Sequence, residues 1–171
     1  MHVSRLDPAC PDWQALAEHM AANGDAAWVL DDDGRPKSER LVFLGALVDG
    51  QIVGNLTFLK QPIEIPATEW AEDHDLSLRE AGGGVLYEMF VQTFSVDEAY
   101  LRRGIGRALQ EEALRQARIL GCYQLRSWSS LDKISNYELK LGMKFAFHPA
   151  IYQTDSGLKV SGGYFIRVVQ E

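Results

Sequence analysis

Residues 85–109 read VLYEMFVQTFSVDEAYLRRGIGRAL, and this stretch decides the fold. Val85 to Val96 is rich in β-branched, aromatic and long apolar side chains, as in a buried strand. Apolar side chains then recur at helical spacing from Gly104 to Leu120, and Gly121 ends the pattern. A second apolar run, Tyr123 to Trp128, follows at once. This order of strand, helix and strand predicts a βαβ unit with two parallel strands and a right-handed crossover.

The flanking sequence predicts further helices and a hairpin. A first helix should follow Asp12, because apolar residues recur at helical spacing from there to Asn23-Gly24. Two β-rich runs in residues 41–60 are joined by Asp49-Gly50, a strong signal for a hairpin of antiparallel strands. After the βαβ unit, Ser129-x-x-Asp132 has the form of a capping box and predicts a short helix from there through Leu141.

Two last strands are predicted at Lys144 to Tyr152 and Gly163 to Val169, around a turn at residues 155–157. Residues 61–84 contain prolines and acidic side chains and end in three glycines, so irregular or partly helical structure is expected there. No internal repeat is visible. Residues 1–171 should therefore form a single domain of mixed α/β class.

Composition narrows the class of protein. The chain has 171 residues, 46% of them hydrophobic and 24% charged, which is typical of one globular domain. Its net charge of −7 argues against nucleic-acid binding and favours cationic partners. No apolar run is long enough to cross a bilayer, and the N-terminus lacks a secretory signal. Cys10 and Cys122 suggest neither a disulfide framework nor a metal site, so a cytoplasmic protein without membrane partners is expected.

The turn before the central helix has the chemistry of an anion site. The first amides of a helix have no partners within the helix and carry the positive end of its dipole. Gly104 and Gly106 let an anion approach the backbone, and Arg102, Arg103 and Arg107 add positive charge. Two glycines at a turn often serve backbone geometry alone. The sequence lacks the third glycine of a Rossmann fingerprint and the Gly-Lys-Ser/Thr of a Walker loop, so neither of these nucleotide-binding sites is expected.

Residues 94–109 resemble motif A of the GNAT N-acetyltransferase superfamily. In that motif a strand ending in V-D-P-x-Y leads to [QR]-x-x-G-x-[GA] and a helix. The matching residues are Val96-Asp97, Tyr100 and Arg103-Gly104-Ile105-Gly106, and the departures are Glu98 in place of proline and Leu101 in place of glutamine or arginine. The order of predicted elements resembles the family over nearly the whole chain. The resemblance implies a mixed, mostly antiparallel sheet with a splayed central parallel pair, flanked by helices, in a GNAT-like acyl-CoA N-acyltransferase fold.

The resemblance also implies acetyl-CoA as cosubstrate and a reaction without a metal. An amine would attack acetyl-CoA directly in a ternary complex, and the pantetheine arm would lie between the splayed strands like an additional strand. The implied cofactor-binding residues are Phe94, Val96, Leu101, Arg102, Arg103, Gly104, Ile105, Gly106 and Arg107.

For the catalytic base, the resemblance implies a carboxylate on the long strand, and Glu88 is the candidate. By the period-two rule Glu88 shares a face with Phe90, Gln92 and Phe94. Counting back from Gly104, the position of the usual family glutamate is occupied by Phe90, so an ion-paired structural glutamate is the alternative reading of Glu88.

For the catalytic acid, residues 136–143, NYELKLGM, resemble the family segment in which a tyrosine precedes L-G-F. Tyr137 is the candidate. It lies five residues before Gly142, whereas the family tyrosine usually lies four residues before that glycine, at the place of Glu138. Packing of the Tyr137 ring against its own helix face is the alternative.

The expected function is transfer of an acetyl group from acetyl-CoA to a primary amine, either a small molecule or a peptide, with cationic amines favoured. A homodimer is compatible with the sequence. Two alternatives stay open: a regulatory module that binds acetyl-CoA without catalysis, and an acyltransferase with another acyl-CoA or a hydroxyl acceptor. Acceptor specificity should lie in residues 31–40, residues 61–84 and the last hairpin. The remaining titratable or aromatic candidates, without an assigned role, are His74, His148, Trp28, Trp70 and Trp128.

Overall fold

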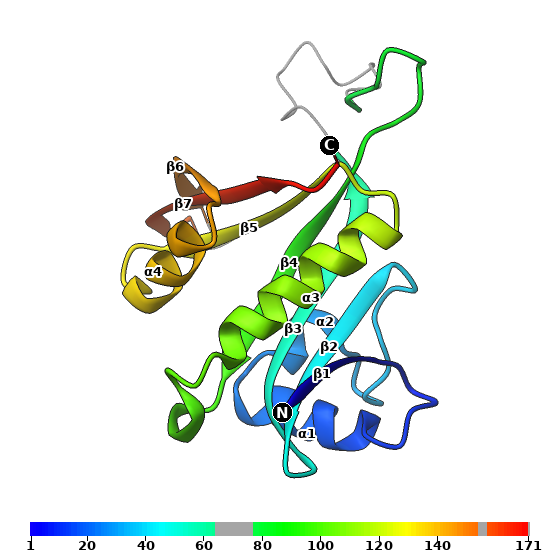
Figure 1. The fold of residues 1–171 in the computed structure, drawn as a ribbon, viewed down its shortest axis with the longest axis vertical. Helices are drawn as coiled ribbons and strands as arrows, with labels where there is room; N and C mark the ends of the chain where they lie inside the picture. Colours follow the sequence, from blue (N-terminus) through cyan, green and yellow to red (C-terminus); the bar gives the residue numbers. More distant parts are fainter. Residues whose placement is uncertain (64–76, 154–156, 171) are drawn as a thin grey trace.

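The computed structural model describes residues 1–63, 77–153 and 157–170 (Figure 1). Its strands form one seven-stranded sheet in the order β1-β2-β3-β4-β5-β7-β6. Neighbouring strands are antiparallel except β4 (Tyr87–Val96) and β5 (Gln124–Ser130), which run parallel. The predicted mixed, mostly antiparallel sheet with a central parallel pair is confirmed.

The N-terminal half of the sheet is a meander of β1 (His2–Leu6), β2 (Leu41–Val48) and β3 (Gln51–Pro62). Asp49 and Gly50 join β2 to β3 with φ values of 51° and 81°, the left-handed conformation that a two-residue hairpin turn requires. The predicted hairpin is therefore confirmed. The sequence analysis missed β1, an edge strand too short to carry a clear alternating pattern.

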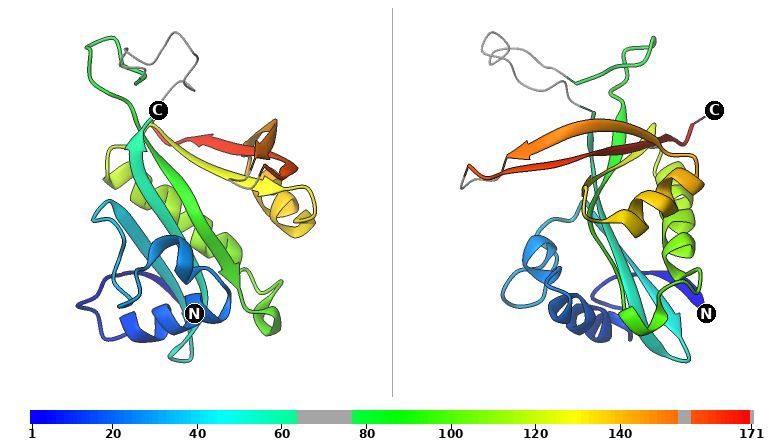
Figure 2. Two further views of the ribbon diagram at one scale, coloured as in Figure 1. Left: turned by 180° about the vertical axis from the view of Figure 1, so that it is seen from behind. Right: turned by 90° about the vertical axis from the view of Figure 1, so that its left-hand side faces the viewer.

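Helices cover both faces of this half of the sheet (Figure 2). The helix α3 (Ile105–Ile119) lies on one face, and α1 (Trp13–Ala22) with the short α2 (Ala26–Val29) lies on the other. The main core joins the apolar face of α3 to β2, β3, β4 and β5, and a second cluster packs α1 against β2. Among the described residues, no helix is long and apolar enough to cross a membrane.

The C-terminal part contains α4 (Ile134–Gly142) and the hairpin of β6 (Ala146–Gln153) and β7 (Lys159–Val168). The predicted capping box is wrong. Ser129 and Ser130 pair with Gly163 and Gly162 of β7, so their backbone is extended and belongs to β5. The helix begins four residues later, after Lys133, without a side-chain cap.

A β-bulge interrupts β4 at Gln92. Thr57 of β3 pairs with Thr93, but the next residue, Phe58, pairs with Val91, so Gln92 has no partner in the register. An extra residue reverses the alternation of side chains beyond it.

The bulge decides which side chains face each layer. Beyond it, Phe94 packs against the α3 core, whereas the Ser95 hydroxyl donates to the Asp25 carboxylate between α1 and α2. The prediction that Phe94 shares a face with Glu88 is therefore wrong, because the period-two rule assumes a regular strand.

The parallel pair is short and then splays. Pairing between β4 and β5 ends at Val91 and Ser127, although β4 continues to Val96 and β5 to Ser130. Figure 1 shows β5 and β7 diverging from β4 on the side where α4 lies. Residues 92–96 of β4 and 128–130 of β5 therefore face each other across a gap, here called the interstrand slot, without pairing to each other.

Candidate active site

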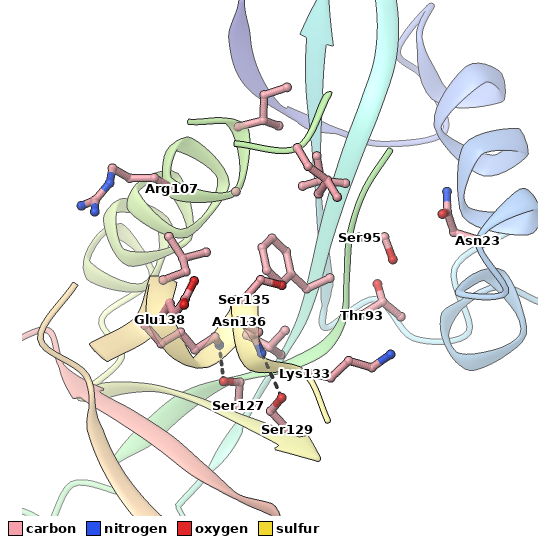
Figure 3. A pocket seen from close by; sticks show the side chains of 18 of the residues that line it. Asn23, Thr93, Ser95, Arg107, Ser127, Ser129, Lys133, Ser135, Asn136 and Glu138 are labelled. Atoms are coloured by element: carbon pink, nitrogen blue, oxygen red, sulfur yellow. Dashed lines mark hydrogen bonds between the residues drawn. The ribbon is translucent and has the colours of Figure 1, made fainter. Parts of the chain in front are cut away.

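A cavity of about 800 Å³ occupies the interstrand slot and continues to the turn before α3. Its walls come from β4, β5, α4 and the first turn of α3. Figure 3 shows Thr93 and Ser95 on the side of the cavity nearest Asn23, and Arg107 and Glu138 on the other side. The cavity thus joins the α1 side of the sheet to the N-terminus of α3.

The cofactor-binding residues predicted from the sequence gather at this cavity. All of them except Arg103 line it. The Arg103 guanidinium instead lies over the Tyr100 ring, 5.0 Å from the ring centroid. Tyr100 belongs to a short 3-10 helix, Glu98–Tyr100, that links β4 to the turn before α3.

The N-terminus of α3 presents free amides. Its first internal hydrogen bond runs from Ala108 N to Gly104 O, which leaves the amides of residues 105–107 without partners in the helix. Gly104 is the N-cap residue and has a φ of 83°, a conformation that disfavours any side chain. These amides and the helix dipole make this end of the cavity suitable for a phosphate.

Gly106 serves a different purpose from Gly104. A Cβ atom at position 106 would lie 3.2 Å from Phe94 Cζ and 3.3 Å from Leu139 Cδ2, and both side chains line the cavity. A larger residue would therefore push into the space between α3, β4 and α4.

The cavity fits the shape and chemistry of acetyl-CoA. The two strand edges of the interstrand slot do not pair with each other, so their backbone groups can meet an extended arm with its own amides. The other end combines free helix amides with the Arg102 and Arg107 side chains. The two ends match a pantetheine arm and a pyrophosphate.

Glu88 lies outside the cavity lining and has no solvent exposure. Its carboxylate accepts hydrogen bonds from Arg126, Gln124 and Gln61, and the Arg126 Nη2 atom lies 2.5 Å from Oε1. Burial alone would raise the pKa of Glu88, but these hydrogen bonds and the Arg126 charge hold the pKa below its ordinary value. The geometry favours the ion-paired structural glutamate over a catalytic base.

Tyr137 also lies outside the cavity lining. Its hydroxyl donates to the Ser129 carbonyl oxygen at 3.1 Å, and its ring centroid lies 4.8 Å from that of Phe165 and 5.3 Å from that of Phe147. Burial, followed by the charge of Asp132, raises the pKa of the phenol above its ordinary value. This placement favours packing over catalysis, because the hydroxyl is already engaged with the backbone. The packing partners lie on β6 and β7 and not on the tyrosine's own helix face.

Glu138, which takes the place of the usual family tyrosine, does line the cavity. Its carboxylate pairs with Arg102 at 3.1 Å, and both side chains are exposed. The ion pair bridges α4 and the turn before α3, at the end of the cavity suited to a phosphate.

Two groups of polar residues were not predicted from the sequence, one in the cavity lining and one behind it. One is Lys140, which is 1% exposed and donates a hydrogen bond to Ser127 Oγ. The signal in the sequence is its position three residues after Tyr137, on the helix face that turns inward. The other group surrounds Asp25, whose Oδ2 accepts from Ser95 Oγ at 2.7 Å and from Asn55 Nδ2 at 3.0 Å.

The other aromatic and histidine candidates differ in placement. Trp128 lines the cavity, whereas Trp28 is 70% exposed and lies outside its lining. His148 is exposed on β6. Trp70 and His74 lie outside the described residues. In the part of the chain that the structure describes, no three His, Cys, Asp or Glu side chains gather closely enough to hold a metal ion.

The sheet, its splayed pair and the cavity together define an acyl-CoA N-acyltransferase fold. The chain belongs to the acetyltransferase (GNAT) family, whose profile matches residues 5–143. A search of curated proteins finds no match.

Solved structures share the fold at low sequence identity. NAA60 of Arabidopsis thaliana in complex with acetyl-CoA is 16% identical with a TM-score of 0.68, and the match covers 97% of each chain. An aminoglycoside 6′-N-acetyltransferase complexed with coenzyme A is 10% identical with a TM-score of 0.65, covering 100% of this chain and 98% of that one. Ribosomal-protein-alanine N-acetyltransferase of Brucella melitensis is 16% identical with a TM-score of 0.63, covering 98% and 99%.

Proposed function

We propose that this protein is an acetyl-CoA-dependent N-acetyltransferase that acetylates a primary amine by direct attack in a ternary complex. The observation that carries the proposal is the interstrand slot, which continues into the free amides at the N-terminus of α3. Acetyl-CoA supplies an activated acetyl group. The slot would align its pantetheine arm along the strand edges, and residues 102–107 would hold the pyrophosphate.

The acceptor amine would enter from the α1 side of the sheet. The bulge at Gln92 turns Thr93 and Ser95 toward this side, where both line the cavity. The Asp25 carboxylate stands directly behind Ser95. A carboxylate beside the acceptor end, together with the net charge of −7, favours a cationic amine.

The structural relatives support amine acceptors of more than one size. The names of two of them specify an aminoglycoside and a ribosomal protein's alanine as acetylated groups. Their identity to this chain is too low to choose between a small molecule and a peptide, so both belong in the test.

The test measures free CoA with a thiol reagent while acetyl-CoA is offered with polyamines, aminoglycosides, amino acids and N-terminal peptides. Thiol release that depends on both protein and amine supports the proposal. For cationic acceptors, kcat/KM should fall as salt is raised, because screening weakens the attraction to the cleft. Binding of acetyl-CoA without thiol release from any amine would instead indicate the regulatory module.

A further inference from the structure

A buried lysine stands at the apex of the interstrand slot. Lys140 of α4 is 1% exposed, yet it belongs to the lining of the cavity. Its Nζ donates to the Oγ of Ser127, the last residue of β5 that pairs with β4. Figure 3 shows Ser127 with this hydrogen bond. The Lys140 amine is therefore fixed at the point where the two strands part.

Among the described residues, no carboxylate lies within ion-pair distance of Lys140 Nζ. Two aromatic rings lie near the amine: Nζ is 5.3 Å from the ring centroid of Phe145 and 5.7 Å from that of Phe165. Burial without a counter-charge lowers the pKa of Lys140 from 10.5 to about 7.

The charged and titratable groups on the surrounding elements are mostly engaged elsewhere. Glu138 pairs with Arg102, Glu88 with Arg126, and Tyr137 donates to a backbone carbonyl. Arg107 of α3 and Lys133 also line the cavity, and Arg167 of β7 donates to the Met143 carbonyl. All three are cations, so none of them favours the protonated form of Lys140.

The proposed reaction needs a proton donor at this place. Breaking a thioester bond releases a thiolate, whose conjugate acid has a pKa of about 8.5 in an ordinary thiol. A donor is most effective when its own pKa lies near the working pH. A lysine ammonium that titrates near neutrality is a stronger acid than the thiol, and its charge would also stabilise the departing thiolate in a site shielded from water.

We propose that Lys140 is the catalytic acid that protonates the departing CoA thiolate, with Ser127 as the positioning residue that fixes its amine at the apex of the slot. The inference rests on the proposed function. The acceptor nitrogen forms a bond to the acetyl carbon, and the carbon–sulfur bond breaks with its electron pair passing to sulfur. Sulfur then takes a proton from Lys140 Nζ, and the proton lost by the acceptor nitrogen passes to water. Lys140 regains its proton from solvent.

The kinetic test compares wild type with Lys140→Met, Ser127→Ala and a control, Arg5→Met, at an exposed cation of β1 outside the cavity. In wild type, kcat should fall as pH rises above the pKa of Lys140, because the acid form is lost. Lys140→Met should lower kcat about 10²-fold, remove this alkaline fall and leave the KM for acetyl-CoA within about threefold. Ser127→Ala should lower kcat by a smaller factor, about tenfold, and should retain the decrease of kcat at alkaline pH. Arg5→Met should match wild type.

A second readout does not depend on turnover. The titration of the Lys140 side chain is followed by NMR of labelled lysine, assigned by its loss in Lys140→Met, with either CoA or desulfo-CoA bound. If Lys140 Nζ lies next to the CoA sulfur, the titration midpoint should be higher in the CoA complex than in the desulfo-CoA complex by about 0.5 pH unit or more, because a nearby thiolate favours the ammonium.

Either of two results would overturn the assignment of Lys140: equal midpoints in the two complexes, or a Lys140→Met enzyme that keeps both kcat and the alkaline fall. Acetylation of Lys140 itself, detected by mass spectrometry, would also overturn it, because the residue would then be a nucleophile. Absence of acetyl transfer by wild type would refute the proposed function instead.

Discussion

Replacing Lys140 by methionine should stabilise the protein at mildly acidic pH. The pKa of Lys140 is about 7 in the folded protein because burial disfavours the ammonium, against 10.5 for a free lysine. Between these values the unfolded chain binds more protons than the folded one, so stability rises with pH. The full cost of burying the ammonium is present below pH 7, and it is relieved as pH rises through 7 toward 10.5.

The magnitude follows from the two pKa values. For wild type, the linkage relation gives a free energy of unfolding that is about 2 to 3 kcal/mol lower at about pH 6 than at about pH 9, from this group alone. Methionine has a similar length and no charge, so the variant should lack this dependence. Its stability relative to wild type should therefore be about 2 to 3 kcal/mol more favourable at about pH 6 than at about pH 9.

Urea unfolding followed by tryptophan fluorescence measures the difference, with Lys159→Met as the control for removing an exposed lysine. Lys159→Met should differ from wild type by the same amount at both pH values. If Lys140→Met also keeps a constant difference from wild type, the ammonium is not desolvated, and the reasoning about burial is refuted.

Four substitutions test the remaining assignments. Gly106→Glu should weaken acetyl-CoA binding at least about tenfold in calorimetry, because a carboxylate would crowd the cavity and oppose the pyrophosphate; equal affinity in the folded variant would refute this phosphate site. Glu138→Gln should tighten acetyl-CoA binding about twofold to fivefold by releasing Arg102 from an exposed ion pair, and weaker binding would argue against that reading. Tyr137→Phe should keep kcat within about threefold, since the phenol is engaged with a backbone carbonyl, whereas a loss near 10²-fold in product assays would restore Tyr137 as the acid. Glu88→Gln should cost about 2 to 4 kcal/mol of stability at neutral pH by leaving Arg126 partly unpaired. Because the pKa of Glu88 is lowered, the stability difference between wild type and variant should shrink only as pH falls below about 4.5. A stability difference that is already lost near neutral pH would contradict the ion pair.

Local patterns in the sequence predict much of the fold. The hairpin at Asp49-Gly50 and the helix that begins beside Gly104 depend on short-range signals, namely two left-handed turn residues and a regular apolar stripe. The residues that line the α3 end of the cavity could be grouped from the sequence for the same reason, because a helix N-terminus and its flanking residues are adjacent in the sequence.

The rest of the candidate site depends on contacts between distant segments. The bulge at Gln92 exists only in the pairing of β3 with β4, and it changes the face of every later residue on β4. Glu88 becomes buried because Arg126 and Gln124 arrive from β5 and Gln61 from β3. No local pattern contains these partners.

The capping-box error at Ser129 has a similar origin. The residue pattern suits a helix start, but β7 inserts between β5 and β6 and extends the ladder through Ser130. Pairing with a strand more than thirty residues later in the sequence outweighed the local helix signal.

The central claim is that the interstrand slot delivers an acetyl group from acetyl-CoA to an amine. The most direct measurement offers acetyl-CoA with a carbon-13-labelled acetyl group, together with the amine that releases most thiol, and identifies the products by mass spectrometry. We predict a labelled N-acetyl amine formed in equal amount to free CoA, with both reduced in parallel by Gly106→Glu. Labelled acetyl-CoA that binds but stays intact with every amine, or label found only in an ester, would contradict the account.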